Sequence, residues 1–404
     1  MATSKIVGVI ILCFALACYK GQNVTKDALA PAEKIVNVMS FGAKPDGNFD
    51  STQAFMNAWR IACKSPGQNK LLIPQGRFLV SSMYFAGPCM APLPITVQVV
   101  GTVLATTDIS DYENVEWLMF EDIDGLNLIG GGTFDGQGHN SWSRVVDCEK
   151  TPSTCIRNPS SLFFNKVTNG VIMDIKSLNS KGFHVFVTNC ANIRLIGLHI
   201  TAPSTSPNTD GIHVSHSTHV RIFRSVIGTG DDCVSIIQGV KNVTIERVDC
   251  GPGHGISIGS LGKYEHELEV REVRVLNCTF VGTDNGLRIK TWPDRYPGAA
   301  SNITFHDITM QRVRNPIIID QEYQCSPANC QKKPSLVKIR DIVFSNVRGT
   351  TSSQIAVDLR CSKLFPCQNV HISNINLNSA SFPIRSRCAN IKPIYSGVQH
   401  PPAC

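Results

Sequence analysis

Short segments in which apolar and polar residues alternate recur along the middle and C-terminal parts of the chain. Each begins with asparagine or another polar residue and continues as V/I-x-I/V/L/F-x-x-V/I, as in "NGVIMDI" from Asn169 and "KNVTIERVDC" from Lys241. Alternation with a period of two, in segments rich in β-branched residues, predicts short β-strands with one buried face. With the first apolar residue as the marker, successive copies lie 22, 27 and 23 residues apart, at Val171, Ile193, Val220 and Val243.

A repeat of roughly 22–30 residues that holds several short strands predicts a solenoid whose stacked coils bury a shared core. Because helical periodicity is nearly absent, we expect an all-β protein with the fold of a right-handed parallel β-helix. A β-sandwich or a β-propeller is the less favoured alternative. One amphipathic helix is predicted at Ser51–Cys63, "STQAFMNAWRIAC", and should cap the open N-terminal end of the core.

The N-terminus carries the features of a secretory signal. Lys5 provides a positive charge, the apolar run from Ile6 to Cys18 is too short to span a bilayer, and Ala15–Ala17 offers small residues for cleavage. Residues 1–20 are therefore predicted to be a signal peptide, and residues 21–404 a single β-helical domain. We expect a secreted, extracellular protein with no membrane span.

The cysteines fit an oxidising compartment. The chain has 16, and 14 of them lie beyond Cys18, an even number that suits disulfides. The chain contains no C-x-x-C pair of the kind found in metal sites. The short gaps between other cysteines predict local disulfides at Cys148/Cys155, Cys325/Cys330 and Cys361/Cys367. Four N-x-S/T triplets are compatible with glycosylation, at Asn23, Asn242, Asn277 and Asn302.

The formal charge is +7, and only 7% of the residues are aromatic. A mildly basic secreted protein can attract a polyanion, but the chain has no run of Lys and Arg and no basic face with interleaved aromatic residues. We therefore expect no nucleic-acid partner and no membrane partner, and we expect a monomer.

Two adjacent aspartates, Asp231 and Asp232, interrupt the apolar, glycine-rich stretch "SVIGTGDDCVSI". Asp210 lies 21 residues before Asp231 and His254 lies 23 residues after it, and both gaps equal one coil. Residues one coil apart lie about 4.8 Å apart, so we expect these side chains within about 10 Å of one another. Neighbouring glycines let the chain leave strand geometry and turn both aspartates toward one cleft.

A cationic pair follows in "NGLRIKTW", where Arg288 and Lys290 share one face of a strand. Beside three carboxylates, such a pair keeps acids ionised and can bind a carboxylate of a substrate. Paired carboxylates cleave glycosidic bonds, one donating a proton while another activates water. A zinc site at His213, His216 and His219 is disfavoured because their spacing alternates faces on a strand, and we expect no metal and no cofactor.

The strings "NTDG", "GDD", "GHG" and "RIK", in this order within residues 208–290, resemble the four motifs of the polygalacturonases, glycoside hydrolase family 28. The likeness extends over nearly the whole mature chain. The resemblance implies a right-handed parallel β-helix and metal-free hydrolysis of α-1,4-linked galacturonan with inversion of the anomeric centre. Further segments that resemble the family are "FGAKPDG" (Phe41–Gly47), "GGTFDGQG" (Gly131–Gly138) and "NPIIIDQEY" (Asn315–Tyr323).

The resemblance also implies a role for each residue of the site. By motif position, Asp231 would be the general acid, and Asp210 and Asp232 would be the pair that activates water. His254 would tune the protonation of the acid. Arg288 and Lys290 would bind a galacturonate carboxylate, and Asn208 and Tyr323 would line the sugar subsites. It further suggests a disulfide between Cys233 and Cys250. Three acids on adjacent coils are closer together than the usual separation for inversion.

Three functions are alternatives to an exo-acting polygalacturonase. A pectate lyase would use calcium and an arginine base, but no Asp-rich calcium cluster is evident. An inactive wall-binding protein would need the cations and not three aspartates. Endo-action is the third. Exo-action is favoured because "PDRYPG" follows "RIKTW", where plant endo-acting relatives tend to carry glycine, and because "FEDIDGLNLIGGGTFDGQG" resembles the plant exo-acting, pollen-type branch.

Overall fold

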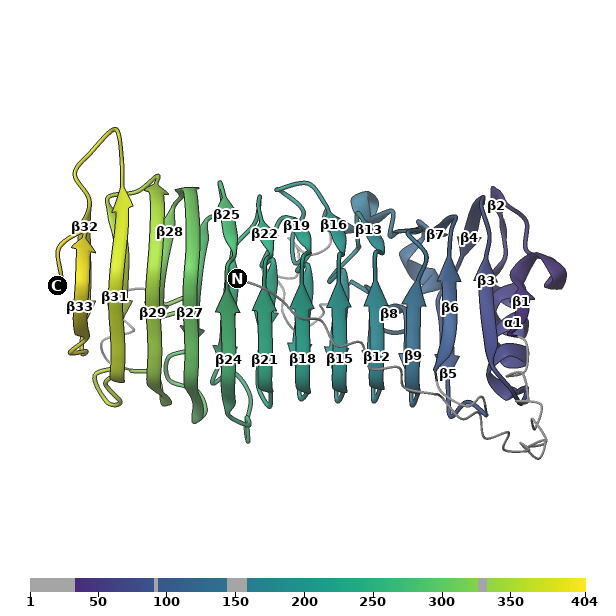
Figure 1. Ribbon diagram of the computed structural model, residues 1–404, viewed down its shortest axis with the longest axis horizontal. Coiled ribbons are helices and arrows are strands. Elements are labelled where there is room, and N and C mark those ends of the chain that lie inside the picture. The colour runs from purple at the N-terminus through teal and green to yellow at the C-terminus, as the bar shows by residue number, and fades with distance from the viewer. Residues whose placement is uncertain (1–32, 91–93, 144–157, 326–332) are drawn as a thin grey trace, which may run out of the picture. The chain divides into compact units, whose positions relative to one another are not determined.

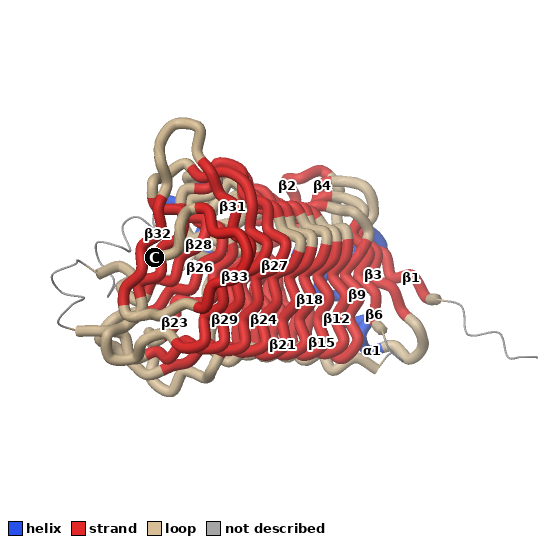
Figure 2. Tube along the Cα trace, turned by 60° about the vertical axis from the view of Figure 1, so that its left-hand side comes forward, coloured by secondary structure: helices blue, strands red, loops and turns tan. Residues whose placement is uncertain are grey.

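The alternating segments form parallel strands that stack coil upon coil (Figure 1). The computed structural model describes residues 33–90, 94–143, 158–325 and 333–404. Within these ranges the strands form one sheet of 22 strands and one of 11 strands, and Figure 2 shows the coils lying one behind another. The parallel β-helix is therefore confirmed. The predicted signal peptide and Asn23 lie outside the described residues.

The larger sheet is built from the long and short strands that follow one another within each coil. Its strands are β1 (Lys34–Asn37), β2 (Asp46–Asp50), β3 (Asn69–Ile73), β4 (Arg77–Val80), β6 (Ile95–Val99), β7 (Thr102–Ala105), β9 (Asp124–Ile129), β10 (Thr133–Asp135), β12 (Thr168–Met173), β13 (Lys176–Leu178), β15 (Ala191–Ile196), β16 (His199–Thr201), β18 (Thr218–Phe223), β19 (Val226–Gly228), β21 (Lys241–Glu246), β22 (Asp249–Cys250), β24 (Val270–Leu276), β25 (Thr279–Val281), β27 (Gly298–Val313), β29 (Val337–Thr351), β31 (Gln368–Asn378) and β33 (Ile394–His400).

The smaller sheet contains one strand per coil. Its strands are β5 (Met83–Ala86), β8 (Glu116–Glu121), β11 (Ser160–Asn165), β14 (Val185–Thr188), β17 (Ile212–Ser215), β20 (Val234–Ile236), β23 (Ile256–Leu261), β26 (Asn285–Thr291), β28 (Asn315–Asp320), β30 (Ile355–Arg360) and β32 (Arg385–Ala389). The helical segments in the described ranges are α1 (Thr52–Lys64) and the short 3-10 turns η1 (Val38–Phe41), η2 (Ile109–Asp111) and η3 (Gly138–Ser141). No described helix combines the length and apolar character that crossing a bilayer needs.

The repeated segment corresponds to the long strands β12, β15, β18 and β21. Ile193 pairs with Val220 and Val220 pairs with Val243, and all three side chains are buried. The polar residue that opens each copy has a left-handed backbone, with φ of 56° at Asn192 and 55° at His219. Asparagine is the non-glycine residue that best tolerates this conformation, which explains its recurrence at this place in the pattern.

In the first copy the apolar marker is wrong by one residue. Gly170, and not Val171, pairs with Ile193 and faces the core, while Val171 is only half-buried. A Cβ atom added at Gly170 would lie 2.9 Å from Cδ1 of Ile193 and 3.3 Å from Cγ1 of Val167. A larger residue here would therefore force the Ile193 side chain to shift. A glycine carries no hydrophobic signal, which is why the pattern shifted.

The predicted helix is confirmed and begins one residue later than expected, because Ser51 occupies the N-cap position. Its buried face meets the first coils. The Phe55 and Phe78 rings lie 5.8 Å apart, and the Trp59 and Phe85 rings lie 5.2 Å apart edge to face. Helix α1 lies at the end of the strand stack opposite the C-terminus (Figure 1), and so it covers the N-terminal end of the core.

The core beneath the smaller sheet contains aligned aromatic rings. Phe85, Phe120 and Phe164 occupy paired positions on β5, β8 and β11, and their ring centroids are 4.4 and 5.2 Å apart in stacked geometry. Parallel pairing repeats one position at every coil, about 4.8 Å further along, which is close to the distance at which aromatic rings stack. The same register aligns the side chains of the functional site.

The disulfides at Cys361–Cys367 and Cys233–Cys250 are both confirmed. The expectation from the even number of cysteines is wrong in one respect, because Cys190 and Cys278 are reduced and buried in the core. Cys148, Cys155 and Cys330 lie outside the described residues. Two further bonds, which were not predicted, link Cys63 with Cys89 and Cys388 with Cys404.

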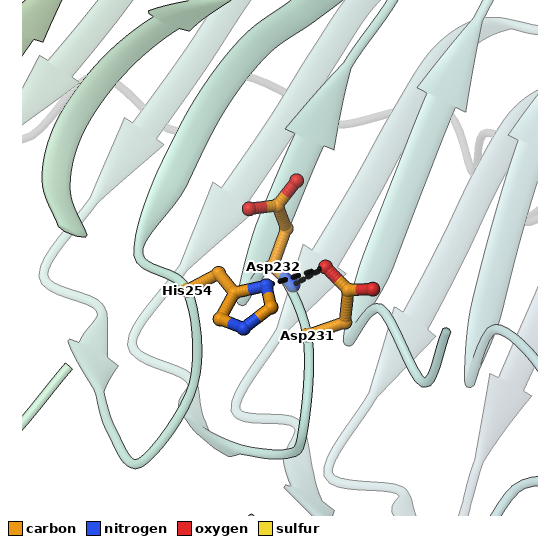
Figure 3. Close-up of side chains that lie close together, drawn as sticks. All are labelled: Asp231, Asp232 and His254. Carbon is orange, nitrogen blue, oxygen red and sulfur yellow. Dashed lines mark hydrogen bonds and ion pairs between the residues drawn. The ribbon is translucent and has the colours of Figure 1, made fainter. Parts of the chain in front are cut away.

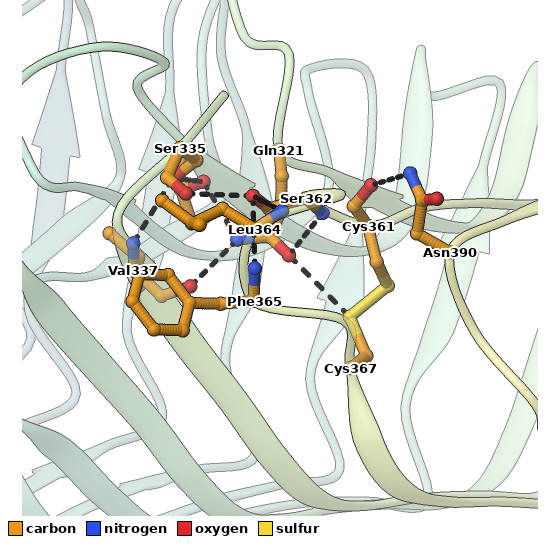
Figure 4. Close-up of a disulfide and its surroundings, with 10 residues drawn as sticks. Gln321, Ser335, Val337, Cys361, Ser362, Leu364, Phe365, Cys367 and Asn390 are labelled. Carbon is orange, nitrogen blue, oxygen red and sulfur yellow. Dashed lines mark hydrogen bonds between the residues drawn. A yellow bond between two sulfur atoms is a disulfide. The ribbon is translucent and has the colours of Figure 1, made fainter. Parts of the chain in front are cut away.

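The Cys361–Cys367 bond closes the connection between β30 and β31 (Figure 4). Inside this loop, the Ser362 backbone N–H donates to Gln321 Oε1 at 2.9 Å, and its hydroxyl donates to the Ser335 carbonyl at 2.8 Å. The disulfide is a local one, as the short gap predicted, and it holds a turn whose polar groups are paired within the protein.

Candidate active site

The predicted catalytic residues lie in the turns that lead into neighbouring strands of the smaller sheet. Asp210 precedes β17, Asp231 and Asp232 precede β20, and His254 precedes β23. These three strands pair in sequence, so one coil places its residues directly beside those of the next. Stacking therefore brings the aspartates and the histidine together, as their spacing predicted.

Asp231 and His254 form a pair at the accessible part of the site (Figure 3). His254 Nδ1 lies 2.9 Å from Asp231 Oδ1, which also accepts the Asp232 backbone N–H at 2.8 Å. The hydrogen bond to Asp231 raises the pKa of His254, and burial opposes the rise only in part. The Asp231 side chain is 21% exposed and that of His254 is 37% exposed, so a substrate can reach both.

Asp232 is buried instead of facing the cleft as predicted. Its Oδ1 accepts from Arg288 Nη2 at 2.6 Å and from the Ser257 hydroxyl at 2.8 Å, and its Oδ2 accepts from Lys290 Nζ at 2.8 Å. Burial by itself would raise the pKa of Asp232, but Lys290 and Arg288 outweigh it and hold the pKa far below its usual value. In Figure 3 the two neighbouring carboxyl groups point in different directions.

The cations lie on β26 and share one face, as predicted. Burial would lower their pKa values, but the Asp232 carboxylate raises the pKa of both Arg288 and Lys290. Two cations thus meet one carboxylate, which leaves one positive charge in excess. Lys290 Nζ also lies 5.2 Å from the ring centroid of Tyr323, which packs edge to face against Trp292. Tyr323 is therefore at the site.

Asp210 is buried, and its pKa is raised well above the usual value. Burial is the main cause, and the negative charges of Asp231 and Asp232 add to it. Asp210 and Asp232 thus differ in their affinity for protons, Asp210 holding its proton more strongly. Asn208, two residues before Asp210, has an exposed side chain and a left-handed backbone with φ of 52°. Its role in binding sugar stays a prediction.

His213 belongs to the site, although the sequence analysis considered it only as a disfavoured zinc ligand. Its Nδ1 lies 2.8 Å from Asp210 Oδ2, and its ring stacks on Phe183 with centroids 4.2 Å apart and meets Phe186 edge to face. The sequence signal was an aspartate three residues before a histidine. The chain turns between Asp210 and β17, and the turn brings the two side chains together even though on a straight strand they would diverge.

We expect His213→Phe to lower kcat/KM about ten-fold and to shift the acidic limb of the pH–rate profile to higher pH. Nδ1–H donates to Asp210 when the carboxylate is ionised, and a hydrogen bond to a charged group contributes about 1.5–3 kcal/mol. Without it, Asp210 keeps its proton to higher pH. The measurement is kcat/KM against pH on polygalacturonate.

His213→Asn serves as the matched control, because its side-chain amide can donate from nearly the position of Nδ1. It should recover most of the activity and of the original acidic limb. If both variants lose activity equally without moving the profile, His213 only packs against Phe183 and Phe186, and the assignment is wrong.

Donor atoms of Asp231, Asp232 and His254 lie within 4.8 Å of one another, and this is the group of possible metal ligands in the described part of the chain. The donor set suits a cation poorly. Arg288 and Lys290 already donate to both oxygens of Asp232 and place two positive charges beside it. No further Asp-rich cluster that could hold calcium occurs among the described residues.

The surroundings raise the pKa of Asp210 and lower that of Asp232. Together with the excess positive charge of Arg288 and Lys290, this arrangement is typical of an acid–base hydrolytic site for an anionic substrate. Residues 63–400 match glycosyl hydrolases family 28, and the chain belongs to this family. This confirms the family that the four motifs predicted.

Relatives of similar length match almost end to end. An exopolygalacturonase of Platanus acerifolia is 46% identical over 370 residues, which cover 91% of this chain and 97% of the relative. An exopolygalacturonase of Arabidopsis thaliana, clone GBGE184, is 43% identical over 97% of this chain and 93% of its own. A polygalacturonase of Gossypium hirsutum is 45% identical over 91% of this chain and 89% of its own.

Solved structures share the fold. The endo-xylogalacturonan hydrolase of Aspergillus tubingensis superimposes with a TM-score of 0.80, at 24% identity, over 90% of this chain and all (100%) of its own. The exopolygalacturonase of Thermotoga maritima superimposes with a TM-score of 0.74, at 21% identity, over 90% of both chains. At these identities the likeness concerns the fold, and it agrees with the parallel β-helix described above.

Proposed function

We propose that the protein is a secreted polygalacturonase that cleaves α-1,4-galacturonosidic bonds of pectin and releases galacturonate from chain ends in the plant cell wall. The observation that carries this proposal is the cationic pair Arg288 and Lys290, which has one positive charge in excess after pairing with Asp232. An oxygen of Asp232 lies within 4.8 Å of one of Asp231. A galacturonate carboxylate can satisfy that charge. The names of the plant relatives support exo-action.

Asp231 fits the role of general acid. It is accessible, and a proton on His254 Nδ1 can be donated to it across the 2.9 Å hydrogen bond. The raised pKa of His254 keeps this proton in the site at a pH where a free histidine would begin to lose it. Asp231 can then pass the proton to the glycosidic oxygen as the bond breaks.

Asp210 and Asp232 fit the activation of water. Asp232 remains ionised, because its pKa lies far below the usual value. It accepts three hydrogen bonds, and since a carboxylate has about four lone-pair sites it can accept one more, from the water. Asp210 has a raised pKa, so once ionised it is the stronger base of the two. Activity should therefore rise as Asp210 loses its proton and fall where the Asp231–His254 pair loses its own.

Inversion is part of the proposal. Both oxygens of Asp232 and one oxygen of Asp210 already accept hydrogen bonds, which leaves these carboxylates poorly placed to form a covalent glycosyl bond. Direct attack by water then inverts the anomeric centre. An oxygen of Asp231 lies within 4.8 Å of an oxygen of Asp232. In inverting enzymes the two catalytic carboxyl groups are usually roughly 6.5–9.5 Å apart. The separation alone therefore favours retention, so the stereochemistry needs a direct test.

Digestion of polygalacturonate followed by chromatography and proton NMR tests each part of the proposal. Monomer as the sole early product is expected for exo-action, and mixed oligomers would indicate endo-action. The β-anomer should appear first if the reaction inverts. Unsaturated products that absorb ultraviolet light would instead identify a lyase, and no product at all would indicate a wall-binding protein.

Exhaustive chelation should leave activity unchanged, because side chains fill every proposed role. The measurement is the initial rate on polygalacturonate after dialysis against a chelator, with and without added calcium. Loss of activity that calcium restores would favour the lyase alternative and would assign the donors of Asp231, Asp232 and His254 to a metal.

Four disulfides between described residues support secretion, since such bonds persist in oxidising compartments. Glycosylation at Asn242, Asn277 and Asn302, a monomeric state and the signal peptide are parts of the same proposal. Mass spectrometry of the secreted protein would establish its N-terminus and any attached glycans.

A further inference from the structure

A second charged surface lies on the larger sheet, on a different side of the coils from the turns that carry the active site. It is formed by the outward side chains of β15, β18, β21 and β24 and of the residue after β18 and β21, and we call it the arginine face. Its basic members are Arg194, Arg221, Arg224, Lys241, Arg247, Arg271 and Arg274. The same strands carry only Glu246 and Glu272 as acids, which leaves five positive charges in excess.

The pairing register arranges these cations in rows along the stacking direction. Arg194 pairs with Arg221, Arg221 with Thr244, and Thr244 with Arg274. Successive positions lie about 4.8 Å apart, so this row extends over roughly 14 Å. Lys241 pairs with Arg271 in a second row. The four strands lie side by side in the middle of the stack in Figure 1.

Few of these charges are neutralised within the protein. Glu246 lies 3.0 Å from Arg221 and 3.9 Å from Arg247, and Lys241 lies 3.9 Å from Glu272. In the described ranges no salt bridge involves the remaining members, Arg194, Arg224, Arg271 and Arg274. Like charges on neighbouring strands repel one another, so the arrangement carries a cost that an anionic partner would remove.

An aromatic ring holds part of the cluster together. The guanidinium carbons of Arg221, Arg224 and Arg247 lie 4.9, 4.7 and 5.7 Å from the ring centroid of Phe223. Cation–π contacts of this kind orient planar guanidinium groups that would otherwise move freely in solvent. Their donors are then set to bind carboxylates.

We propose that the arginine face binds a galacturonan segment at a site separate from the catalytic one. This rests on the proposed function, which makes a linear polymer with one carboxylate on each sugar the substrate. A row of cations that runs along the solenoid matches a linear polyanion in shape and in charge. Binding there holds the enzyme on its polymer and raises the local concentration of chain ends at the active site.

The test compares two triple variants of the full-length enzyme. R194Q/R221Q/R274Q removes one row of the arginine face. K34Q/R77Q/R348Q removes the same charge from three exposed, separate positions on the same sheet and is the matched control. Each protein is assayed for adsorption to a pectate gel at several salt concentrations and for kcat/KM on trigalacturonate, which is short enough to report the active site alone.

We expect the row variant to adsorb about ten-fold less than the control at low salt, the loss that fits removal of three weak, exposed ionic contacts. Its kcat/KM on trigalacturonate should stay within about two-fold of the parent, because none of these residues touches the site. Adsorption equal to that of the control would overturn the proposal. So would equally strong binding to duplex DNA or to vesicles of anionic lipid, since the face would then attract any polyanion.

The outcome separates this proposal from the proposed function. If the parent does not hydrolyse trigalacturonate, the proposed function fails whatever the gel shows. If the parent hydrolyses it and both triple variants adsorb alike, the function stands and only the arginine face is wrong.

Discussion

Asp231→Asn should lower the hydrolysis of polygalacturonate by about 10²–10⁴-fold, the range that general acid catalysis contributes. The amide has no acidic proton for the glycosidic oxygen. Its Oδ1 can still accept the hydrogen bonds from the Asp232 backbone and from His254, so the turn before β20 should keep its shape. Reducing-end release measures the rate, and circular dichroism with thermal unfolding checks the fold.

Asp284→Asn is the matched control for this variant. Asp284 Oδ2 lies 3.6 Å from His254 Nε2, and its side chain is 54% exposed. Asp284 is an acid next to the same histidine, but it is not one of the three aspartates proposed to act in catalysis. Removing its charge should therefore change the rate only a few-fold. If folded Asp231→Asn keeps activity within a few-fold of the parent, or if the two variants behave alike, Asp231 is not the general acid.

Lys290→Met should lower kcat/KM on polygalacturonate by roughly ten- to a hundred-fold. A charge-assisted hydrogen bond to the substrate carboxylate contributes about 1.5–3 kcal/mol, and about 1.4 kcal/mol corresponds to one decade in rate. Highly methyl-esterified pectin lacks that charge, so it should be a poor substrate for the parent and change little in the variant. The informative quantity is the ratio of kcat/KM on the two substrates.

The structure gives Lys290 a second role that this experiment can separate. Lys290 Nζ donates to Asp232 Oδ2, so its removal also leaves a buried carboxylate with one cation, Arg288. Loss of that contact would slow both substrates by the same factor, because it acts through Asp232. A ratio that does not change would therefore show that Lys290 supports Asp232 and does not bind the substrate carboxylate.

Several features of the fold and site followed from local spacing. The interval between apolar segments predicted the coil, and the gaps from Asp210 to Asp231 and from Asp231 to His254 matched it, since a solenoid converts a sequence interval into a fixed distance. Arg288 and Lys290 were placed on one face because strand residues two apart share a side. Helix α1 was recognisable from its own periodicity.

Other features depended on contacts between coils. The marker at Val171 was wrong because the room at Gly170 is decided by Ile193 on the next coil. The expectation that an even number of cysteines means disulfides throughout was wrong because Cys190 and Cys278 are free and buried, and a count says nothing about which sulfurs meet. The contact of His213 with Asp210 was not predicted because a turn, and not strand alternation, sets the direction of this side chain.

The sequence by itself determined the repeating coil, the capping helix and the group of residues that meet in the site, because each depends on distances along the chain. Only the tertiary structure decided how the three aspartates differ in burial and in the charged groups beside them. Asp232 lies buried between Arg288 and Lys290, Asp210 lies buried beside two carboxylates and His213, and Asp231 stays accessible with His254. The pKa of a carboxyl group depends on its burial and on nearby charges, and both come from residues on other coils.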